Sequence, residues 1–301
     1  MELQVIHDTR YDYSAPVSLA HHLAHLQPLQ DAAQQLLAFE LDVQPPAGQA
    51  SDSRDAMGNV QRHFSLAQPH RRLHVRAASR VRLAPRWQGL APEDSPPWAE
   101  VAGRLRYVGG ACYEPAVEFA MPSPFVPRLP ALRDYGGHSL TPGRPLAAAA
   151  IELMHRIHAD FRYQSQSTAV DTPLAQVLEQ RRGVCQDFAH LMAGAMRMLG
   201  LPVRYVSGYL LTHPGDDGPA LVGADASHAW VQVYCPGTPG VPADGWLDLD
   251  PTNDTIPATG HVRLAIGRDF GDVTPLRGVI RGGGRHVLTV AVRTREVEPA
   301  R

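Results

Sequence analysis

The chain has no lysine at all, because each of its 28 basic residues, counted as Lys plus Arg, is an arginine. A P-loop and a Schiff-base mechanism both depend on a lysine side chain, so both are excluded. The abundance of alanine, proline and glycine beside arginine indicates a bias of overall composition as the origin of this absence.

Cysteine is scarce and odd in number, with Cys112, Cys185 and Cys235 alone. Such a sparse set is unlike a disulfide framework, so we expect a reducing cytoplasm. The first residues carry no basic segment followed by an apolar one, and no apolar run approaches the roughly 20 residues of a membrane span, so we expect neither a secretory signal nor a membrane partner. The formal net charge of -2 predicts no attraction to nucleic acid or to an anionic membrane surface.

What is present is a foldable chain of 301 residues, of which 44% are hydrophobic and 19% charged. The first third alternates apolar and polar residues and predicts an antiparallel β-sandwich, with strands over 4–13, 36–43, 60–66 and 73–83. Residues 84–145 are rich in proline and predict a connecting arm over the surface, with a short helix near Phe119.

Helical spacing begins after this arm. We predict helices over 146–161, from Thr172 as N-cap with Pro173 in the first turn, and from Cys185 to a stop at Gly200. Strands follow over 203–211, 228–234, 245–249, 261–264 and 287–293, and 213–220 predicts a mobile loop beside the site. This order indicates an α+β protein, which we divide into an N-terminal β domain with its arm (1–140) and a core with C-terminal strands (141–301).

Cys185 stands at the start of an amphipathic helix, where unpaired N–H groups and the helix dipole favour a thiolate. Gly183, two residues earlier, lets a substrate backbone come close. A buried structural cysteine is the competing interpretation, and Cys185 by itself does not exclude it. Cys235 falls on the apolar face of its strand, so we assign it a structural role.

His228 opens a strand on which His228, Trp230, Gln232 and Tyr234 share the more polar face. An imidazole there could take the thiol proton and return it to a leaving group, whereas a structural histidine is the alternative. The carboxylate that would orient it has two candidates, Asp248 and Asp250, on one face of the next strand. Asp250 precedes Pro251 and so is biased to an extended strand end.

Three segments carry a family resemblance: Gly183-Val184-Cys185-Gln186-Asp187-Phe188-Ala189, then 227–234 from Ser227, and 245–253 ending Asp250-Pro251-Thr252-Asn253. They resemble the motifs of the transglutaminase-like superfamily, which includes animal transglutaminases, peptide N-glycanases and bacterial proteins assigned as cysteine proteases. The flanks 9–17, 54–59 and 267–278 are similar to the bacterial branch, which has an N-terminal β domain before a papain-like core.

This resemblance implies Cys185 as nucleophile, His228 as base and Asp250, rather than Asp248, as the third member. It implies an amide acyl-transfer enzyme, a peptidase, amidase or transglutaminase-like acyltransferase, acting on a peptide or protein. No organic cofactor and no metal is expected. The alternative is a peptide- or protein-binding module that keeps the fold without catalysis; a third possibility is a latent enzyme whose site is covered by the arm at 84–145. The sequence carries no indication of an oligomeric state.

A negative charge on the reacting oxygen requires two donors, and the backbone N–H of Cys185 is one. Tyr163 is our candidate for the second, with Gln180 and Gln186 as alternatives. Trp230 and Trp246 are candidate cleft walls, although either could equally belong to the core. His21, His22 and His25 form a histidine cluster with helical i,i+4 spacing, but they have no clear carboxylate or cysteine partner, so we do not assign a metal to them.

Overall fold

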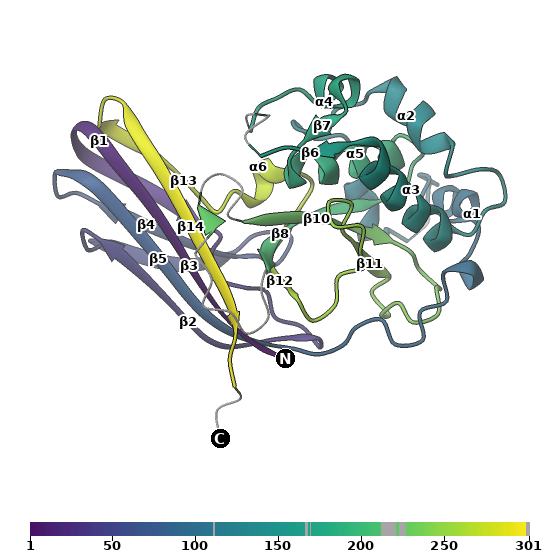
Figure 1. The fold of residues 1–301 in the computed structure, drawn as a ribbon, viewed down its shortest axis with the longest axis horizontal. Coiled ribbons are helices and arrows are strands. Elements are labelled where there is room, and N and C mark those ends of the chain that lie inside the picture. Colours follow the sequence, from purple (N-terminus) through teal and green to yellow (C-terminus); the bar gives the residue numbers. More distant parts are fainter. Residues whose placement is uncertain (111, 166–167, 169, 212–220, 223–226, 299–301) are drawn as a thin grey trace.

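The computed structural model describes residues 1–110, 112–165, 168, 170–211, 221–222 and 227–298. The loop predicted over 213–220 lies outside the described residues. The chain is α+β, as expected, with a curled antiparallel sheet on one side and a helix-covered sheet on the other (Figure 1).

The expected antiparallel β domain is present as a curled sheet of eight hydrogen-bonded strands. Its centre is the 23-residue strand β1 (Glu2–Ala24), whose first half pairs with β5 (His70–Leu83) and β14 (His286–Glu296). The second half of β1 pairs with β4 (Val60–Leu66) and β13 (Leu276–Gly282). The remaining strands are β2 (Gln34–Gln44), β3 (Gln49–Arg54) and β9 (Leu221–Val222). One long strand therefore belongs to both halves of the curled sheet.

The predicted division at residue 140 assigns the last two strands, β13 and β14, to the core. In the structure they belong to the N-terminal sheet instead. In Figure 1, β14 lies beside β1, at the opposite end of the sequence. The physical reason is that β1 has two edges, and β5 covers only one of them. An unpaired strand edge carries a row of unsatisfied N–H and C=O groups, which β13 and β14 supply with partners.

The core sheet is antiparallel and has the order β11 (Trp246–Leu249), β10 (His228–Tyr234), β8 (Val203–Leu210) and β12 (His261–Gly267). The predicted apolar face of β10 is confirmed: Ala229, Val231, Val233 and Cys235 are buried with side chains of α5 (Cys185–Arg197). The polar face is buried too, because Trp230 packs with Leu29 and Met57 from the N-terminal region.

The helices follow the sequence closely. Helix α3 spans Leu146–Asp160, and after α5 the chain turns at Gly200, whose φ of +82° is the left-handed conformation that favours glycine. The prediction of Thr172 as N-cap is wrong: α4 spans Leu174–Gln180 and Pro173 occupies the cap position. A short parallel pair, β6 (Arg162–Tyr163) and β7 (Arg182–Gly183), precedes the cysteine, and α6 (Phe270–Val273) follows β12.

The proline-rich arm is more ordered than its weak periodicity predicts. It contains η1 (Pro92–Asp94), α1 (Trp98–Arg104), η2 (Pro115–Ala120, the short helix expected near Phe119) and α2 (Pro130–Gly137). Leu132 and Val101 join the main core, and Leu132 faces Gly194 in the C-terminal half of α5. Helix α2 of the arm therefore packs against the end of α5 away from Cys185. No helix among the described ranges is long and apolar enough to cross a membrane.

Two amides of the N-terminal region hold the free edge of the core sheet. The Gln34 side chain accepts from Arg263 N at 2.8 Å and donates to Arg263 O at 2.7 Å. The Asn59 side chain does the same for Ile266, at 2.8 and 2.7 Å. A cluster of apolar residues shared by β1, β5, β8 and β12 lies beside these contacts. The two halves of the molecule are thus joined through β12.

Candidate active site

Cys185 is the first residue of α5 and is 7% exposed. The turn before it is held by Asp187, whose carboxylate accepts from Val184 N at 2.8 Å. A side chain at Gly183 would collide with that carboxylate, since a Cβ there would lie 2.7 Å from Asp187 Oδ2. Being first in the helix, Cys185 has a backbone N–H with no acceptor inside the helix. The thiol thus lies where negative charge is stabilised.

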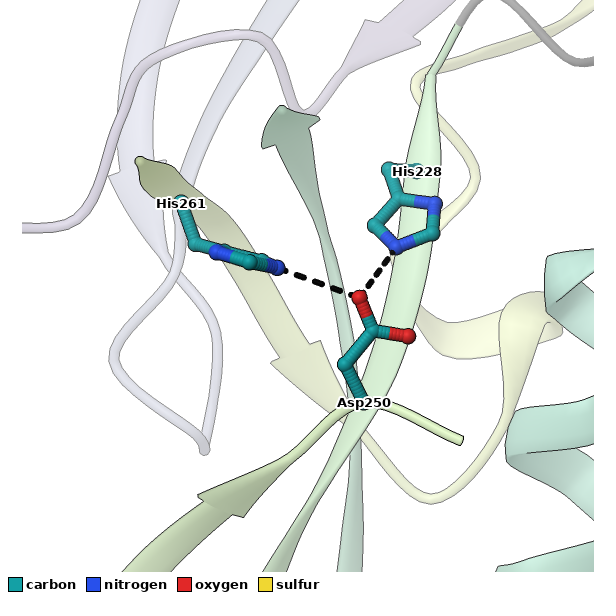
Figure 2. A group of neighbouring side chains, drawn as sticks. All are labelled: His228, Asp250 and His261. Atoms are coloured by element: carbon teal, nitrogen blue, oxygen red, sulfur yellow. Dashed lines mark hydrogen bonds and ion pairs between the residues drawn. The ribbon is translucent and has the colours of Figure 1, made fainter. Parts of the chain in front are cut away.

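His228 begins β10 and faces Asp250, which directly follows β11. His228 Nε2 lies 2.8 Å from Asp250 Oδ2 (Figure 2). The Cys185 side chain is a further hydrogen-bond partner of the ring. Because Nε2 is engaged by the carboxylate, Nδ1 is the nitrogen left for the thiol. The structure therefore brings Cys185, His228 and Asp250 together from a helix and two strands.

The electrostatics of this group favour an ion pair. Burial lowers the pKa of His228, but the charge of Asp250 and hydrogen bonds with Asp250 and Cys185 outweigh it and raise that pKa to about 10. Burial raises the pKa of Asp250, yet the charge of His228 and its hydrogen bonds with His228, His261 and Asn253 bring it well below the usual range. Imidazolium and carboxylate are therefore the stable forms near neutral pH.

Asp250 is fully buried and satisfied on both oxygens. Oδ1 accepts from the backbone N–H groups of Thr252 and Asn253 at 2.9 and 3.2 Å. Oδ2 accepts from the Asn253 amide at 2.7 Å and lies 3.1 Å from His261 Nε2. The carboxylate is thereby fixed in orientation.

The second aspartate has a different environment. Asp248 accepts from the Trp230 indole at 2.9 Å and faces Arg86 at 3.6 Å. Trp230 is 0% exposed and Trp246 4%, so neither lines a cleft as the sequence analysis allowed. Trp230 instead supports the site from behind, with its ring stacked 6.0 Å from that of His228. Trp230 is in the core because Leu29 and Met57 of the N-terminal region pack on it, and Trp246 because Phe119 of η2 covers it.

Tyr163 lies beside the nucleophile segment, since it pairs with Gly183 between β6 and β7, and it is 44% exposed. The Gln186 amide donates to Val170 O at 3.0 Å, and the Gln180 side chain accepts from Arg182 at 3.1 Å. Both glutamines have protein partners in this conformation. The Tyr163 ring packs edge-on against Phe188, with ring centroids 6.5 Å apart.

Among the described residues, one group of side chains could hold a metal ion: His228, Asp250 and His261, whose ligand atoms all lie within 4.8 Å of one another. The cluster of His21, His22 and His25 is not such a group. Its expected helical spacing does not apply, because His21 and His22 lie on β1 and side chains alternate along a strand.

Two residues of the site were missed by the sequence analysis. Asn253 stands three residues after Asp250 in a turn, and an Asp-Pro-Thr-Asn run is a turn signal that could have suggested a local amide partner. His261 lies 11 residues after Asp250 on another strand, and it reaches the carboxylate through strand order alone. No local pattern indicates that contact.

Comparisons with known proteins agree with this architecture. A family described as the bacterial transglutaminase-like N-terminal region matches residues 3–82, and the transglutaminase-like superfamily matches residues 138–251. An uncharacterized protein of Mycobacterium tuberculosis is 38% identical over 279 residues, which cover 92% of this chain and 87% of that protein. An uncharacterized protein of Mycobacterium leprae is 32% identical over 297 residues, which cover 96% of this chain and 97% of that protein.

Two more distant proteins have names that mention an activity. The protein-glutamine gamma-glutamyltransferase of Pseudomonas aeruginosa is 31% identical over 137 residues, which are 44% of this chain and 19% of that one. A solved structure from Cytophaga hutchinsonii, named a "Putative Cysteine Protease", superposes with a TM-score of 0.73 at 20% identity, over 100% of this chain and 92% of that one. The second likeness shows the fold. With both family regions matched in order, this chain belongs to the transglutaminase-like superfamily, with a bacterial transglutaminase-like N-terminal region before the core.

Proposed function

We propose that the protein is a cysteine-dependent enzyme that transfers the acyl group of an amide in a peptide or protein substrate. The observation that carries this proposal is His228, which has Asp250 as the partner of Nε2 and Cys185 as its other hydrogen-bond partner. An imidazole between a thiol and a buried carboxylate is the arrangement that activates a nucleophile.

In the proposed first step, the Cys185 thiolate attacks the amide carbonyl carbon and an oxyanion forms. His228 then gives its proton to the nitrogen of the leaving amine, the C–N bond breaks, and a thioester joins the acyl group to Cys185. Asp250 holds Nε2–H of the imidazolium, so that the proton given to the leaving amine is the one on Nδ1. We assign the backbone N–H of Cys185 and the Tyr163 hydroxyl as donors to the oxyanion.

In the second step, His228 takes a proton from water or from an amine, which attacks the thioester carbonyl and releases Cys185. Water gives hydrolysis and an amine gives acyl transfer, and both share the same acyl-enzyme. The chain has no lysine and so cannot be its own lysine acceptor. Transfer to an added amine can therefore be measured without cross-linking of the enzyme through its own lysines.

We also propose that the protein works in a reducing compartment such as the cytoplasm. Cys112, Cys185 and Cys235 are all free in the structure, and the mechanism needs a reduced thiol.

Alkylation by iodoacetamide at pH 6, with adducts mapped by mass spectrometry, tests the mechanism without knowledge of the substrate. Cys112 is exposed and serves as an internal reference, while Cys235 is buried and burial raises its pKa. We expect Cys185 to react at least about tenfold faster than Cys112, because the proposed mechanism pairs its thiol with His228 at a helix N-terminus and the thiolate is the form that is alkylated.

In His228→Ala this advantage should disappear. Labelling that spares Cys185, or that is equally fast without His228, would exclude the mechanism and favour the binding module. A cell lysate is then treated with either the wild type or Cys185→Ala. Peptides that are altered only by the wild type would identify the substrate. A fluorescent primary amine added to the same lysate distinguishes transfer from hydrolysis.

A further inference from the structure

The carboxylate of Asp250 has a histidine on each side. Figure 2 shows the rings of His228 and His261 both pointing at the same oxygen, Oδ2, from different strands. The two Nε2–Oδ2 distances are 2.8 and 3.1 Å. His261 is the first residue of β12, is 7% exposed, and takes no part in the proton transfers proposed above.

The spacing of these atoms is that of hydrogen bonds rather than of ligands around a metal. Two ligands at tetrahedral angles and with bonds of about 2.0 Å to zinc would be separated by about 3.3 Å. His228 Nε2 and Asp250 Oδ2 are closer, at 2.8 Å. Each contact is explained by an N–H group that donates to the carboxylate.

His261 is held by packing and by its strand. Its ring lies edge-to-face with Trp230, with ring centroids 5.3 Å apart, and the Trp230 ring lies over β8 at Gly208. There is no room for a side chain on β8 at this point, since a Cβ on Gly208 would be 2.4 Å from the Trp230 ring. The glycine thus allows rings from β10 and β12 to approach across the strand between them, with His228 and His261 centred 6.1 Å apart.

The strand that carries His261 is in turn fixed by the N-terminal region. β12 is an edge strand of the core sheet, and its outer backbone groups at Arg263 and Ile266 are bonded by Gln34 and Asn59. Without these amides the edge would be free to fray. A chain of direct contacts therefore runs from the N-terminal sheet through β12 and His261 to Asp250.

We infer that His261 is a positioning residue, through which the N-terminal region holds Asp250 in the orientation that directs it at His228. The inference rests on the proposed function, because it assigns His228 as the base. Loss of His261 removes one of the donors to Oδ2 and leaves the carboxylate freer to turn away from His228. The thiolate–imidazolium pair then forms only at higher pH.

The test is the pH dependence of Cys185 alkylation by iodoacetamide in His261→Leu. The titratable groups that face His228 in the described structure are Cys185 from α5, Asp250 after β11 and His261 from β12. We expect the rate at pH 6 to fall about tenfold and the rate at pH 9.5 to be nearly unchanged, because an unassisted thiol is largely ionised there. His261→Gln, whose amide can still donate to Oδ2, should restore part of the rate at pH 6.

His7→Leu is the matched control. His7 is another buried histidine at the junction, hydrogen-bonded to Tyr209 and Thr9 at 3.0 Å each, and it does not contact Asp250. The His7→Leu substitution should lower the thermal stability and leave the pH profile of Cys185 alkylation unchanged. A purely structural role for His261 predicts the same behaviour for His261→Leu, and that result would overturn the inference.

Failure of the inference can be told apart from failure of the proposed function. If His228→Ala shifts the alkylation profile and His261→Leu does not, only the positioning role is lost. If neither variant shifts it, the proposed mechanism itself is wrong. A wild-type profile that changes with EDTA would mean that a bound metal, and not hydrogen bonding, joins these side chains.

Discussion

At the scale of single residues, two aspartates that the sequence presents as near equivalents have different tasks. Both are buried, at 1% and 0% exposure for Asp248 and Asp250. Asp248 accepts from Trp230 and faces Arg86, so it stabilises the sheet, whereas Asp250 faces His228. Asp248, within β11, is thus a structural carboxylate, and Asp250, just after the end of that strand, is the candidate catalytic one.

We predict that Asp250→Asn lowers the rate of Cys185 alkylation at pH 6, and any amidase or transferase activity, by about two to four orders of magnitude, because the imidazole loses the group that fixes its tautomer. Asp248→Asn should reduce stability yet change the alkylation rate less than about threefold, since its partner is an indole away from the proton path. Equal losses of reactivity in the two variants would contradict this division of roles.

The interaction between Asp250 and His228 also makes the stability of the protein depend on pH. Asp250 helps to raise the pKa of His228 to about 10, above its ordinary 6.5. The stabilisation that results is fully present below about pH 6.5 and is lost as the pH rises through about 10. Chemical denaturation of the wild type between pH 7 and 10.5 should record this loss, and Asp250→Asn should flatten it.

At the scale of secondary-structure elements, Gly208 decides how closely the strands around the site can pack. It lies in β8 opposite His228, and a Cβ there would be 2.2 Å from Val262 O and 2.4 Å from Trp230. One of these neighbours is backbone and the other is a fully buried ring, so neither can move away at small cost.

We predict that Gly208→Ala lowers the free energy of unfolding by about 3 kcal/mol, the upper part of the range for overpacked cores. Gly103→Ala in α1 is the matched control, because nothing lies within 4 Å of the added carbon. Alanine should stabilise that helix by up to about 1 kcal/mol. Urea unfolding of both variants measures the difference, and a tolerated Gly208→Ala would show that the contacts around β8 can relax.

At the scale of the whole molecule, the N-terminal sheet and the core share buried surface. Leu3 and Val5 of β1 lie in one apolar cluster with Tyr209 and Val262 of the core sheet, and His7 bonds Tyr209. The amide of Asn59 occupies the backbone groups of Ile266 at the sheet edge. Such continuity predicts that the two halves unfold together.

We predict that Asn59→Leu destabilises the protein by about 2–6 kcal/mol, because it leaves a buried N–H and a buried C=O of β12 without partners at a cost of about 1–3 kcal/mol each. Calorimetry should also resolve two thermal transitions in place of one, as the junction weakens. Gln35→Leu, at an exposed position of β2, is the control and should stay within about 0.5 kcal/mol of the wild type. A single unshifted transition in Asn59→Leu would refute the role of this amide.

The sequence by itself determined the parts whose signals are local. The alternation of His228 to Cys235 identified the face of β10 that packs on the helices, and the apolar spacing after Cys185 identified α5. Motif order also brought forward Cys185, His228 and Asp250, because each motif lies within a few residues of its candidate.

Only the tertiary structure decided the contacts between distant segments. The pairing of β14 with β1, the burial of Trp230 under the N-terminal region and the approach of His261 to Asp250 depend on which strands become neighbours. Strand neighbours are chosen by the joint burial of whole faces and edges, and no short window of sequence contains that information. The sequence therefore determined which side chains could do the chemistry, and the fold decided what holds them in place.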